Sequence, residues 1–514
     1  MSQPLITVHH GDTHTELAAH EGQTALGLIR DTGIPFSAPC GGKGTCGKCG
    51  LFVRDEAGLR FQLACQTIVT DGMTLEVGEE VPMLIEDAGL SLAHDFAVNM
   101  GVSGCGVAFD LGTTTLACRL FDLSDGSLLA TATLVNPQAV FGADVISRID
   151  ASMAGQLDAM ESAITRALAQ LIERLCAEAE ISREQIVRIT LAGNTIMQHI
   201  ASGLPPDTIG VSPFEPLSLF GEERQVARLD TPVYLAPCVA GYVGGDITCG
   251  LLACGVHTSE RPQLLIDLGT NGEMAIGSKA DIVSCATAAG PVFEGANIRF
   301  GMPALPGAIN AARELDGILE IETIGNKTPV GICGTGLIDL IAILLRRGII
   351  ENTGRLLSAE KAANIPDLPT TLLNRLGTEG GFSVFYLTED RSVYLTQVDI
   401  RNVQLAKSAI FSGVLVLLED LGLSTSDLDA LFIAGGFGRR LDLTNAATVG
   451  LFPFELLDRA QAVGNTSIEG ASAALISTQA REELSELTRQ CRYVELSTST
   501  SFNRFFTEYM IFEP

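Results

Sequence analysis

Short runs of alternating apolar and polar residues begin the chain and are typical of a small domain with several strands and one helix. The segments "PLITVHH" and "THTELAAHEG" predict a hairpin, and "TALGLIRDTG" has the spacing of a short amphipathic helix that ends at Gly33. The segments "CGLFVRDE" and "MTLEV" predict two more strands. We therefore expect a small α+β domain over residues 1–80.

A longer pattern occurs twice after this domain. "GVAFDLGTTTLACRLFDLSDGSLLATATL" predicts a strand that delivers Asp110 to a turn, and two more strands follow. "QLLIDLGTNGEMAIGSKADIVSCATA" repeats this order, with Asp267 in the place of Asp110. Such wide spacing indicates a duplicated fold unit rather than a solenoid repeat. A strand followed by a Gly-rich turn, "ALFIAGGFGRR", covers residues 430–440.

Composition narrows the class of protein. The chain has 514 residues, of which 46% are hydrophobic. It also contains 54 glycines, so we expect a large core with many loops. The window "AIFSGVLVLLEDLGL" is interrupted by Glu419 and Asp420 and predicts a buried helix rather than a membrane span. A formal charge of −28 opposes binding to nucleic acid or to anionic membranes. The start of the chain lacks the pattern of a secretory signal, so we expect a cytoplasmic protein.

Four of the 13 cysteines form a spaced set, C-x5-C-x2-C-x15-C, made of Cys40, Cys46, Cys49 and Cys65. Three thiols on a tight loop and one from a later strand are how a [2Fe–2S] cluster is held. Structural zinc sites usually use two C-x2–4-C pairs, and Cys65 has no cysteine near it, but zinc and unliganded thiols stay open as alternatives. We expect the other nine cysteines to be small buried side chains: Cys105, Cys118, Cys176, Cys238, Cys249, Cys254, Cys285, Cys333 and Cys491.

The cysteine-rich loop "CGGKGTCGKCG" also matches two phosphate-loop patterns, G-x-G-x-x-G and most of a Walker A motif. A Walker loop needs a helix after it and a hydroxyl for Mg²⁺. Here a predicted strand follows, and Cys49 stands where the hydroxyl is needed. We therefore interpret Gly41, Gly42, Gly44 and Gly47 as positions where the backbone wraps closely around a cluster.

The two repeated hairpins have the chemistry of a phosphate clamp. Glycine lets backbone amides approach phosphate oxygens, and Thr and Asn side chains donate further hydrogen bonds. An Asp at a strand end can hold Mg²⁺ directly or through water. In the third motif, glycines would let the backbone lie against a flat base. The candidate ATP-site residues are Asp110, Gly112, Thr113, Thr114, Asp267, Gly269, Thr270, Asn271, Gly435, Gly436 and Phe437.

Several other residues have a functional and a structural interpretation. Glu294 can polarise a water or bind Mg²⁺, or it can be structural. Asp144 and Arg148 have i, i+4 spacing on a predicted helix, which fits an exposed ion pair, or a position in a cleft if the family resemblance given next holds. His199 is expected to be a hydrogen-bonded core histidine. The Gly-rich junctions "AGNT" and "GICGTG", the second of which contains Gly334, either offer N–H groups to phosphate or serve tight packing.

These motifs resemble those of known families. "DLGTT", "DLGTN" and "AGGFG", in this order, look like the phosphate-1, phosphate-2 and adenosine motifs of the actin, hexokinase and sugar-kinase superfamily. The first 80 residues resemble a ferredoxin of the adrenodoxin kind whose fourth cysteine arrives early. More narrowly, the chain resembles the reductive activators of corrinoid proteins through "NPQAVFGADVISRI", "LAGNTIMQHI", "ATAAGPVFEGANI", "GICGTGLIDL" and "DIRNVQLAKSAI".

The resemblance implies an α/β multidomain fold. A ferredoxin-like [2Fe–2S] domain over 1–80 and a linker over 81–104 would precede a duplicated, two-lobed, actin-like (ribonuclease-H-like) ATPase. Its lobes would cover 105–258 and 259–514, with C-terminal helices returning to the first lobe. The activator of the corrinoid iron–sulfur protein has a separate middle domain, which this spacing leaves no room for. We therefore expect a different corrinoid partner, such as one from a methyltransferase system.

The implied activity is ATP-dependent delivery of one electron to the Co(II) corrinoid of a corrinoid-binding protein or methyltransferase subunit, which restores Co(I). The implied cofactors are a [2Fe–2S] cluster, ATP and Mg²⁺, with Asp110, Asp267 and Glu294 as catalytic residues. An upstream low-potential electron donor and a homodimer are further expectations. Two alternatives stay open: a small-molecule kinase with a redox-sensing cluster, and a nucleotide-gated ferredoxin without turnover. The sequence offers no recognisable sugar-binding set for the kinase.

Overall fold

A computed structural model describes most of the chain in two compact units. Unit 1 consists of the described parts of Met1–Pro82 with Phe96–Asp246 and Ala471–Glu482, and unit 2 contains Ile247–Gly470 and the described part of Glu483–Pro514. The residues described are 4–10, 13–20, 22–32, 34, 36, 38, 41–44, 49–55, 58–77, 96–99, 101–436 and 440–512.

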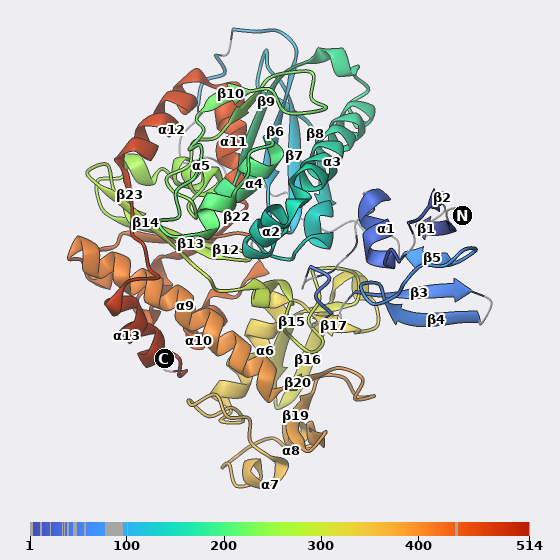
Figure 1. The fold of residues 1–514 in the computed structure, drawn as a ribbon. Helices are drawn as coiled ribbons and strands as arrows, with labels where there is room; N and C mark the ends of the chain where they lie inside the picture. Colours follow the sequence, from blue (N-terminus) through green and yellow to red (C-terminus); the bar gives the residue numbers. More distant parts are fainter. Residues whose placement is uncertain are drawn as a thin grey trace. The chain divides into compact units, whose positions relative to one another are not determined.

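The N-terminal part of unit 1 contains a five-stranded sheet in the order β2-β1-β5-β3-β4 and one helix, α1, which Figure 1 shows between this sheet and the rest of the unit. The predicted hairpin, helix and two later strands are confirmed, and β4 is an additional strand. Alternation explains β3, where Leu51 and Val53 are buried and Phe52 is exposed. The bounds are β1 (Leu5–His10), β2 (Thr13–Ala18), α1 (Ala25–Thr32), β3 (Gly50–Asp55), β4 (Gly58–Leu63) and β5 (Thr74–Val77).

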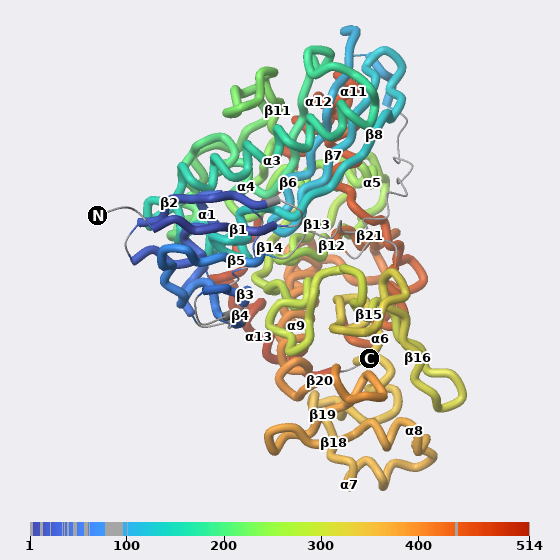
Figure 2. The backbone as a smooth tube through the Cα atoms, turned by 90° about the vertical axis from the view of Figure 1, so that its right-hand side faces the viewer, coloured from blue at the N-terminus to red at the C-terminus, as the bar shows by residue number. Residues whose placement is uncertain are grey.

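The rest of unit 1 is built on a six-stranded sheet in the order β10-β11-β9-β6-β7-β8. Strands β6, β7 and β8 form an antiparallel meander, and β9 runs parallel to β6 on its other side. Figure 2 shows β6, β7 and β8 side by side. The strands are β6 (Cys105–Leu111), β7 (Thr115–Asp122), β8 (Leu128–Val135), β9 (Ile186–Gly193), β10 (Glu222–Arg224) and β11 (Val233–Leu235). The helices are η1 (Pro137–Val140), α2 (Val145–Ala151), α3 (Leu157–Glu178) and α4 (Thr195–Ala201).

The sheet of unit 2 has the order β22-β21-β12-β13-β14-β23, and its first five strands repeat the topology of β11-β9-β6-β7-β8. The sixth strands differ, because β23 pairs with β14 and β10 pairs with β11. Strands β12, β13 and β14 form the antiparallel meander, and β21 runs parallel to β12. The predicted duplication is therefore confirmed, and in both copies the Asp is the penultimate residue of the first strand. The strands are β12 (Gln263–Leu268), β13 (Gly272–Gly277), β14 (Ile282–Thr287), β21 (Ala430–Ala434), β22 (Ala460–Gly464) and β23 (Cys491–Tyr493).

Two small sheets and several helices complete unit 2. The sheets are β15 (Ala308–Leu315), β16 (Ile318–Thr323) and β17 (Gly331–Ile332), and β18 (Leu376–Glu379), β19 (Phe382–Tyr386) and β20 (Tyr394–Thr396). The helices are η6 (Pro291–Glu294), α6 (Gly334–Arg346), α7 (Ala359–Ala362), α8 (Thr370–Leu373), α9 (Gln397–Leu421), α10 (Leu443–Val449) and α13 (Thr500–Glu508). Helix α5 (Gly245–Cys254) passes from unit 1 to unit 2, and α11 (Thr466–Ile476) and α12 (Thr478–Gln490) span the later boundaries.

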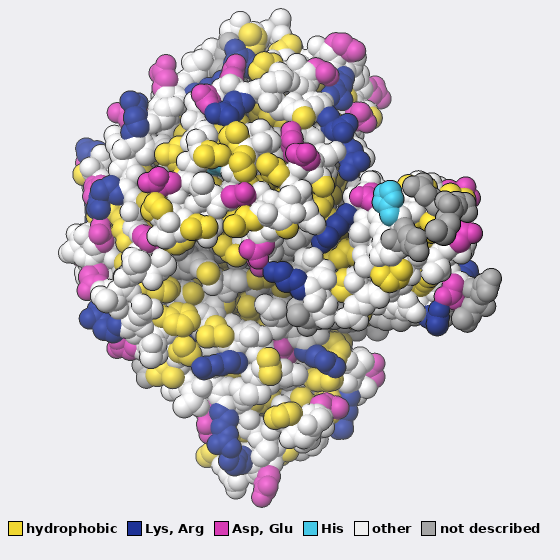
Figure 3. Space-filling model, viewed as in Figure 1, with side chains coloured by type: hydrophobic (Ala, Val, Ile, Leu, Met, Phe, Trp, Pro, Cys, Tyr) yellow, Lys and Arg dark blue, Asp and Glu magenta, His cyan; other side chains and the backbone are white. Residues whose placement is uncertain are grey.

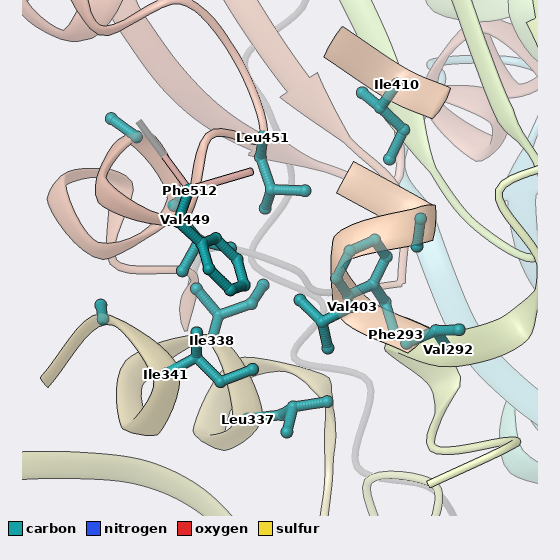
Figure 4. Packing of buried hydrophobic residues seen from close by; sticks show 14 of the residues in the cluster. Val292, Phe293, Leu337, Ile338, Ile341, Val403, Ile410, Val449, Leu451 and Phe512 are labelled. Carbon is teal, nitrogen blue, oxygen red and sulfur yellow. The ribbon is translucent and has the colours of Figure 1, made fainter. Parts of the chain in front are cut away.

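Helix α9 is the central helix of the unit 2 core. Among the described residues it is the one helix long and apolar enough to cross a membrane, but 72% of its most apolar stretch is buried within the protein. Figure 4 shows Val403 of α9 among Leu337 and Ile338 of α6 and Phe293 of η6. Burial of this kind identifies α9 as a core helix, as the interrupted apolar run in the sequence predicted.

Candidate functional site

Two of the four predicted cluster cysteines lie in described parts of the chain, and their sulfurs face each other. Cys49 precedes β3 and is buried, and Cys65 follows β4. The Sγ atoms of Cys49 and Cys65 are 3.2 Å apart. Cys40 and Cys46 lie outside the described residues, and within the described residues no group of three or more His, Cys, Asp or Glu side chains could hold a metal ion. The convergence of two thiols from separate strands fits a cluster site, and the four-cysteine set stays a prediction.

The loop that contains the first three cysteines of the set, residues 40–50, is named here the cluster loop. Its described glycines before Cys49 have the conformations that close backbone wrapping requires. Gly41, Gly42 and Gly44 have φ values of +62°, +90° and +73°, which L-residues rarely adopt. A Cβ on Gly41 would lie 2.9 Å from the carbonyl oxygen of Phe141, in the loop before α2. The described part of the loop, residues 41–44, therefore packs against the second part of unit 1.

The turn between β6 and β7 is held from one side by three hydrogen bonds to consecutive carbonyls. The Gly112 carbonyl accepts from Asn136 Nδ2 at 2.8 Å, and the Thr114 carbonyl accepts from the backbone N–H of Asn136 at 2.8 Å. Arg148 Nη2 donates to the Thr113 carbonyl at 2.6 Å. In a trans peptide the N–H points away from the carbonyl, so the following N–H groups are turned to the opposite side. An array of N–H groups on one side of a turn is suited to an anion.

Side-chain packing tightens the same turn. Asn194, which caps α4 by accepting from the Met197 N–H, donates through Nδ2 to Thr113 Oγ1 at 3.1 Å. A Cβ on Gly193 would lie 2.8 Å from the Leu111 carbonyl oxygen. Of the two interpretations of "AGNT", the described contacts are therefore those of packing behind the turn that follows Asp110.

In unit 2, three predicted elements meet at the end of β12. Thr270 Oγ1 donates to Glu294 Oε1 at 2.9 Å, which joins the turn after β12 to η6. Strand β21 pairs with β12 in a register that sets Ala434 opposite Asp267. A Cβ on Gly435 would consequently lie 2.7 Å from Asp267 Oδ1. The structure thus brings Glu294 and Gly435, which come later in the sequence, to the strand end and turn that contain Asp267 and Thr270.

The remaining candidates of unit 2 have different surroundings. Asn271 Nδ2 donates to Glu273 Oε1 at 3.0 Å, and Gly436 is exposed with open space around it. Gly334 begins α6, where the neighbouring Thr335 Oγ1 donates to the Asn310 carbonyl at 2.6 Å, a packing contact with β15. Phe437 lies outside the described residues.

Two predictions about buried groups had different outcomes. His199 is a hydrogen-bonded core histidine as expected: Nδ1 lies 2.7 Å from the Thr195 carbonyl oxygen, and Nε2 accepts from the Ser218 N–H at 3.3 Å. Burial lowers the pKa of His199, so the ring is neutral at pH 7. The prediction of an exposed ion pair between Asp144 and Arg148 is wrong. Asp144 caps α2 through the Ser147 N–H. Arg148 is fully buried behind the turn between β6 and β7, residues 112–114, named here the phosphate-1 turn after the motif it resembles.

Comparison with known proteins relates this arrangement to one family. A family model described as the C-terminal, ASKHA domain of RACo matches residues 261–514, and one described as the RACo middle region matches residues 105–259. The corrinoid activation enzyme RamQ of Eubacterium limosum is 30% identical over 91% of this chain and 93% of its own length. The chain belongs to the RACo family.

Other RACo relatives support this placement over most of the chain. The [Co(II) methylated amine-specific corrinoid protein] reductase of Methanosarcina barkeri is 24% identical over 78% of this chain and 76% of its own length. The solved structure of a reductive activator for corrinoid, iron–sulfur protein superposes with a TM-score of 0.72 at 29% identity, covering 99% of this chain and 98% of that one. The actin-like ATPase fold predicted for the duplicated part is thereby confirmed.

The RACo comparison also corrects one expectation. The match to the RACo middle region covers residues 105–259, so the counterpart of that region is present in this chain. The sequence interpretation assigned the same residues to the first ATPase lobe and therefore found no room for a middle domain. The argument for a different corrinoid partner that rested on its absence no longer holds.

Sequence reasoning also missed two residues that the structure places at the site. Asn136 was part of a quoted motif but had no assigned role, although an Asn before a Pro is typical of a helix N-cap, which it forms for η1. Arg30 on α1 reaches the cluster loop and the residues before α2. No local pattern identifies such a contact, because Val140 is 110 residues away from Arg30 and both partners are backbone carbonyls.

Proposed function

We propose that this RACo protein is an ATP-dependent reductive activator that passes one electron to the Co(II) corrinoid of a partner protein and so restores Co(I). The observation that carries the proposal is the combination, in one chain of this family, of converging thiols at Cys49 and Cys65 with duplicated Asp-ended strands of an actin-like ATPase. We expect the partner to be a corrinoid-binding protein or methyltransferase subunit, and the compartment to be the cytoplasm.

Cys40, Cys46, Cys49 and Cys65 would hold a [2Fe–2S] cluster, which supplies a single electron at low potential when bound. The residues described around it fit this use. The two thiols lie close together, and a Cβ on Gly42 would lie 3.9 Å from the Cβ of Cys65, so the backbone approaches this cysteine without a side chain. The two cysteines lie just outside the β3–β4 hairpin, Cys49 before β3 and Cys65 after β4, and the partly exposed side chain of Cys65 supports electron exchange with a donor and an acceptor.

In the ATPase part, each residue has a role that follows from its position. The N–H groups after Gly112 would bind phosphate, and Asp110 and Asp267 would hold Mg²⁺ directly or through water. Glu294 would orient the attacking water, with its carboxylate positioned by the Thr270 hydroxyl. Gly435 and Gly436 would leave room for the adenosine.

ATP is needed because the transfer is unfavourable without it. For a one-electron step each 59 mV of unfavourable potential lowers the equilibrium constant by a factor of about ten. Nucleotide can change this balance only if the activator binds its partner differently in its different nucleotide states. On the face shown in Figure 3, acidic and basic side chains are interspersed, so docking there would rely on individual pairs rather than on one large field.

The test uses the purified, cluster-loaded protein, a reductant and a Co(II) corrinoid protein, with Co(I) absorbance followed with and without Mg-ATP. We expect Co(I) to form only when nucleotide is present. An equal yield of Co(I) without nucleotide would refute the proposal. ATP consumption stimulated by a small metabolite rather than by the corrinoid protein would favour the kinase alternative.

A further inference from the structure

We propose that residues 136–151, named here the relay segment, transmit nucleotide occupancy of the phosphate-1 turn to the cluster loop, with Arg148 and Arg30 as positioning residues. The relay segment consists of Asn136, η1, residues 141–144 and α2. The inference rests on the proposed function, since it assigns a ligand to each end of the segment. All of the contacts involved lie within unit 1.

At its first end the relay segment holds the phosphate-1 turn. It contributes all three donors described above to the carbonyls of Gly112, Thr113 and Thr114. Phosphate bound on the other side of the turn would pull on the N–H groups of the same peptides. Because each peptide is planar, rotation of an N–H toward phosphate also moves its carbonyl, and with it the donors Asn136 and Arg148.

The interior of the relay segment is cross-linked, so a displacement at one residue is shared by the others. Arg148 is fully buried and also donates from Nε to the Gly142 carbonyl at 3.2 Å and from Nη1 to Gln138 Oε1 at 3.3 Å. Asn136 Oδ1 in turn accepts from the Gln138 N–H at 2.9 Å. Buried, hydrogen-bonded networks of this kind adopt discrete arrangements rather than deforming continuously.

The second contact surface of the relay segment lies near its middle, at Val140. The guanidinium of Arg30, on α1, joins it there to the cluster loop. Arg30 Nε donates to the Val140 carbonyl at 2.8 Å, and Arg30 Nη2 donates to the Gly41 carbonyl at 2.9 Å. The guanidinium carbon also lies 5.3 Å from the centre of the Phe141 ring. A rigid, planar group that binds both carbonyls couples the position of Gly41 to that of Val140.

Packing makes the same connection without hydrogen bonds. Val140, Phe141, Val145 and Ile149 of the relay segment belong to one continuous buried cluster with Cys49 and the core of the small sheet domain. Lys43 Nζ of the cluster loop lies 3.2 Å from Asp150 Oδ2 of α2. Both side chains are largely exposed, so this ion pair contributes little to the stability of the contact. The cluster loop and the phosphate-1 turn are therefore two contact surfaces of a single short segment.

The experiment compares the reduced, cluster-loaded protein without nucleotide, with Mg-ADP and with Mg-AMP-PNP, in the absence of any corrinoid protein. The readouts are the EPR spectrum and midpoint potential of the cluster and hydrogen exchange in residues 41–44 and 136–151. In the wild-type protein we expect nucleotide to change the EPR spectrum and to alter exchange at both ends of the segment. Unchanged cluster signals and unchanged exchange in residues 41–44 at saturating nucleotide would overturn the proposal.

Arg30→Ala separates the two ends. We expect nucleotide affinity to stay within twofold of wild type, exchange of residues 41–44 to rise about tenfold, as for the loss of one charge-assisted hydrogen bond, and the nucleotide effect on the cluster to disappear. Arg54→Ala is the matched control, because Arg54 lies on β3 of the same domain and its guanidinium is 4.0 Å from Glu76. Persistence of the nucleotide effect in Arg30→Ala would contradict the relay.

If Arg30→Ala assembles no cluster, the wild-type exchange measurement decides. Failure of the relay and failure of the activator function give different results. ATP-dependent Co(I) formation with a cluster loop that ignores nucleotide would refute the relay alone. A nucleotide-responsive cluster that never reduces Co(II) would refute the activator function and leave the relay in place.

Discussion

Gly435 offers a sharp test of the nucleotide site, because its neighbour Gly436 provides a matched control for the same substitution. Gly435 has a φ of +107°, and a Cβ there would lie 2.5 Å from the Leu268 carbonyl oxygen and 2.7 Å from Asp267 Oδ1. A Cβ on Gly436 would meet nothing within 4 Å, and that residue has an ordinary φ. The substitutions Gly435→Ala and Gly436→Ala therefore add the same methyl group in opposite surroundings.

The expected magnitude for Gly435→Ala has two parts. An Ala in this region of φ costs about 1–3 kcal/mol, and an overlap with backbone that cannot move away costs about 1–3 kcal/mol more. Since partial relaxation relieves both together, we expect a loss of about 2–4 kcal/mol in the free energy of unfolding. For Gly436→Ala we expect a change within about 0.5 kcal/mol, as for an exposed substitution without new contacts.

The assay has a step without nucleotide and a step with it. Urea unfolding of the nucleotide-free variants, followed by circular dichroism, measures the first difference. Because the new methyl displaces Asp267, Mg-ATP affinity should also fall about tenfold. At a concentration 100 times the wild-type Kd, nucleotide would then add about 1.4 kcal/mol to the variant instead of about 2.7. Equal stability of the two Ala variants would refute the packing of Gly435 on Asp267.

Three further predictions concern other parts of the site. Glu294→Gln should keep nucleotide affinity, because its amide oxygen can still accept the hydrogen bond from Thr270. It should slow phosphate release by at least about 100-fold, because it removes the charge that orients the water. An unchanged rate of phosphate release would exclude Glu294 from catalysis. Cys65→Ser should abolish the wild-type EPR signal of the reduced cluster, whereas Cys176→Ala, a buried cysteine far along the chain, should retain it; a normal signal in Cys65→Ser would remove Cys65 from the ligand set. His199 is neutral in the folded protein because its pKa is lowered, so below pH 6.5 the unfolded chain takes up a proton that the folded chain does not. The free energy of unfolding should therefore fall as the pH drops below 6.5, and urea unfolding of His199→Gln should show a smaller fall. Equal pH dependence of the two proteins would contradict burial of the neutral ring.

The parts of the fold that could be predicted are those determined by local patterns. Apolar runs that lead to Asp110 and Asp267 identified the two duplicated strands, because a strand delivering a polar residue to a turn needs no distant information. The glycines at 41, 42 and 44 were predicted to allow close wrapping, and their positive φ values agree with this.

Long-range contacts could not be predicted in the same way. The side chain of Arg148 follows an i, i+4 pattern with Asp144 that favours an exposed pair, and tertiary packing behind the phosphate-1 turn overrode it. The neighbouring positions of Gly435 and Asp267 follow from the parallel pairing of β21 with β12, across a separation that no sequence period reports. Arg30 had no motif at all, since its partners are backbone carbonyls, and any residue type can supply a carbonyl.

The nine buried cysteines outside the cluster set have a practical consequence for loading the protein with iron. All nine are buried as predicted, and burial raises the pKa of Cys118, Cys238 and Cys254 to about 12 and that of Cys491 to about 11. Iron and alkylating reagents react with thiolates, so at neutral pH these four thiols stay protonated, and burial keeps all nine sulfurs out of reach. Among the described cysteines only Cys65 has a partly exposed side chain. In-vitro reconstitution with iron and sulfide should therefore be directed to the small N-terminal sheet, and a thiol-specific label applied to the cluster-free protein should report on that sheet alone.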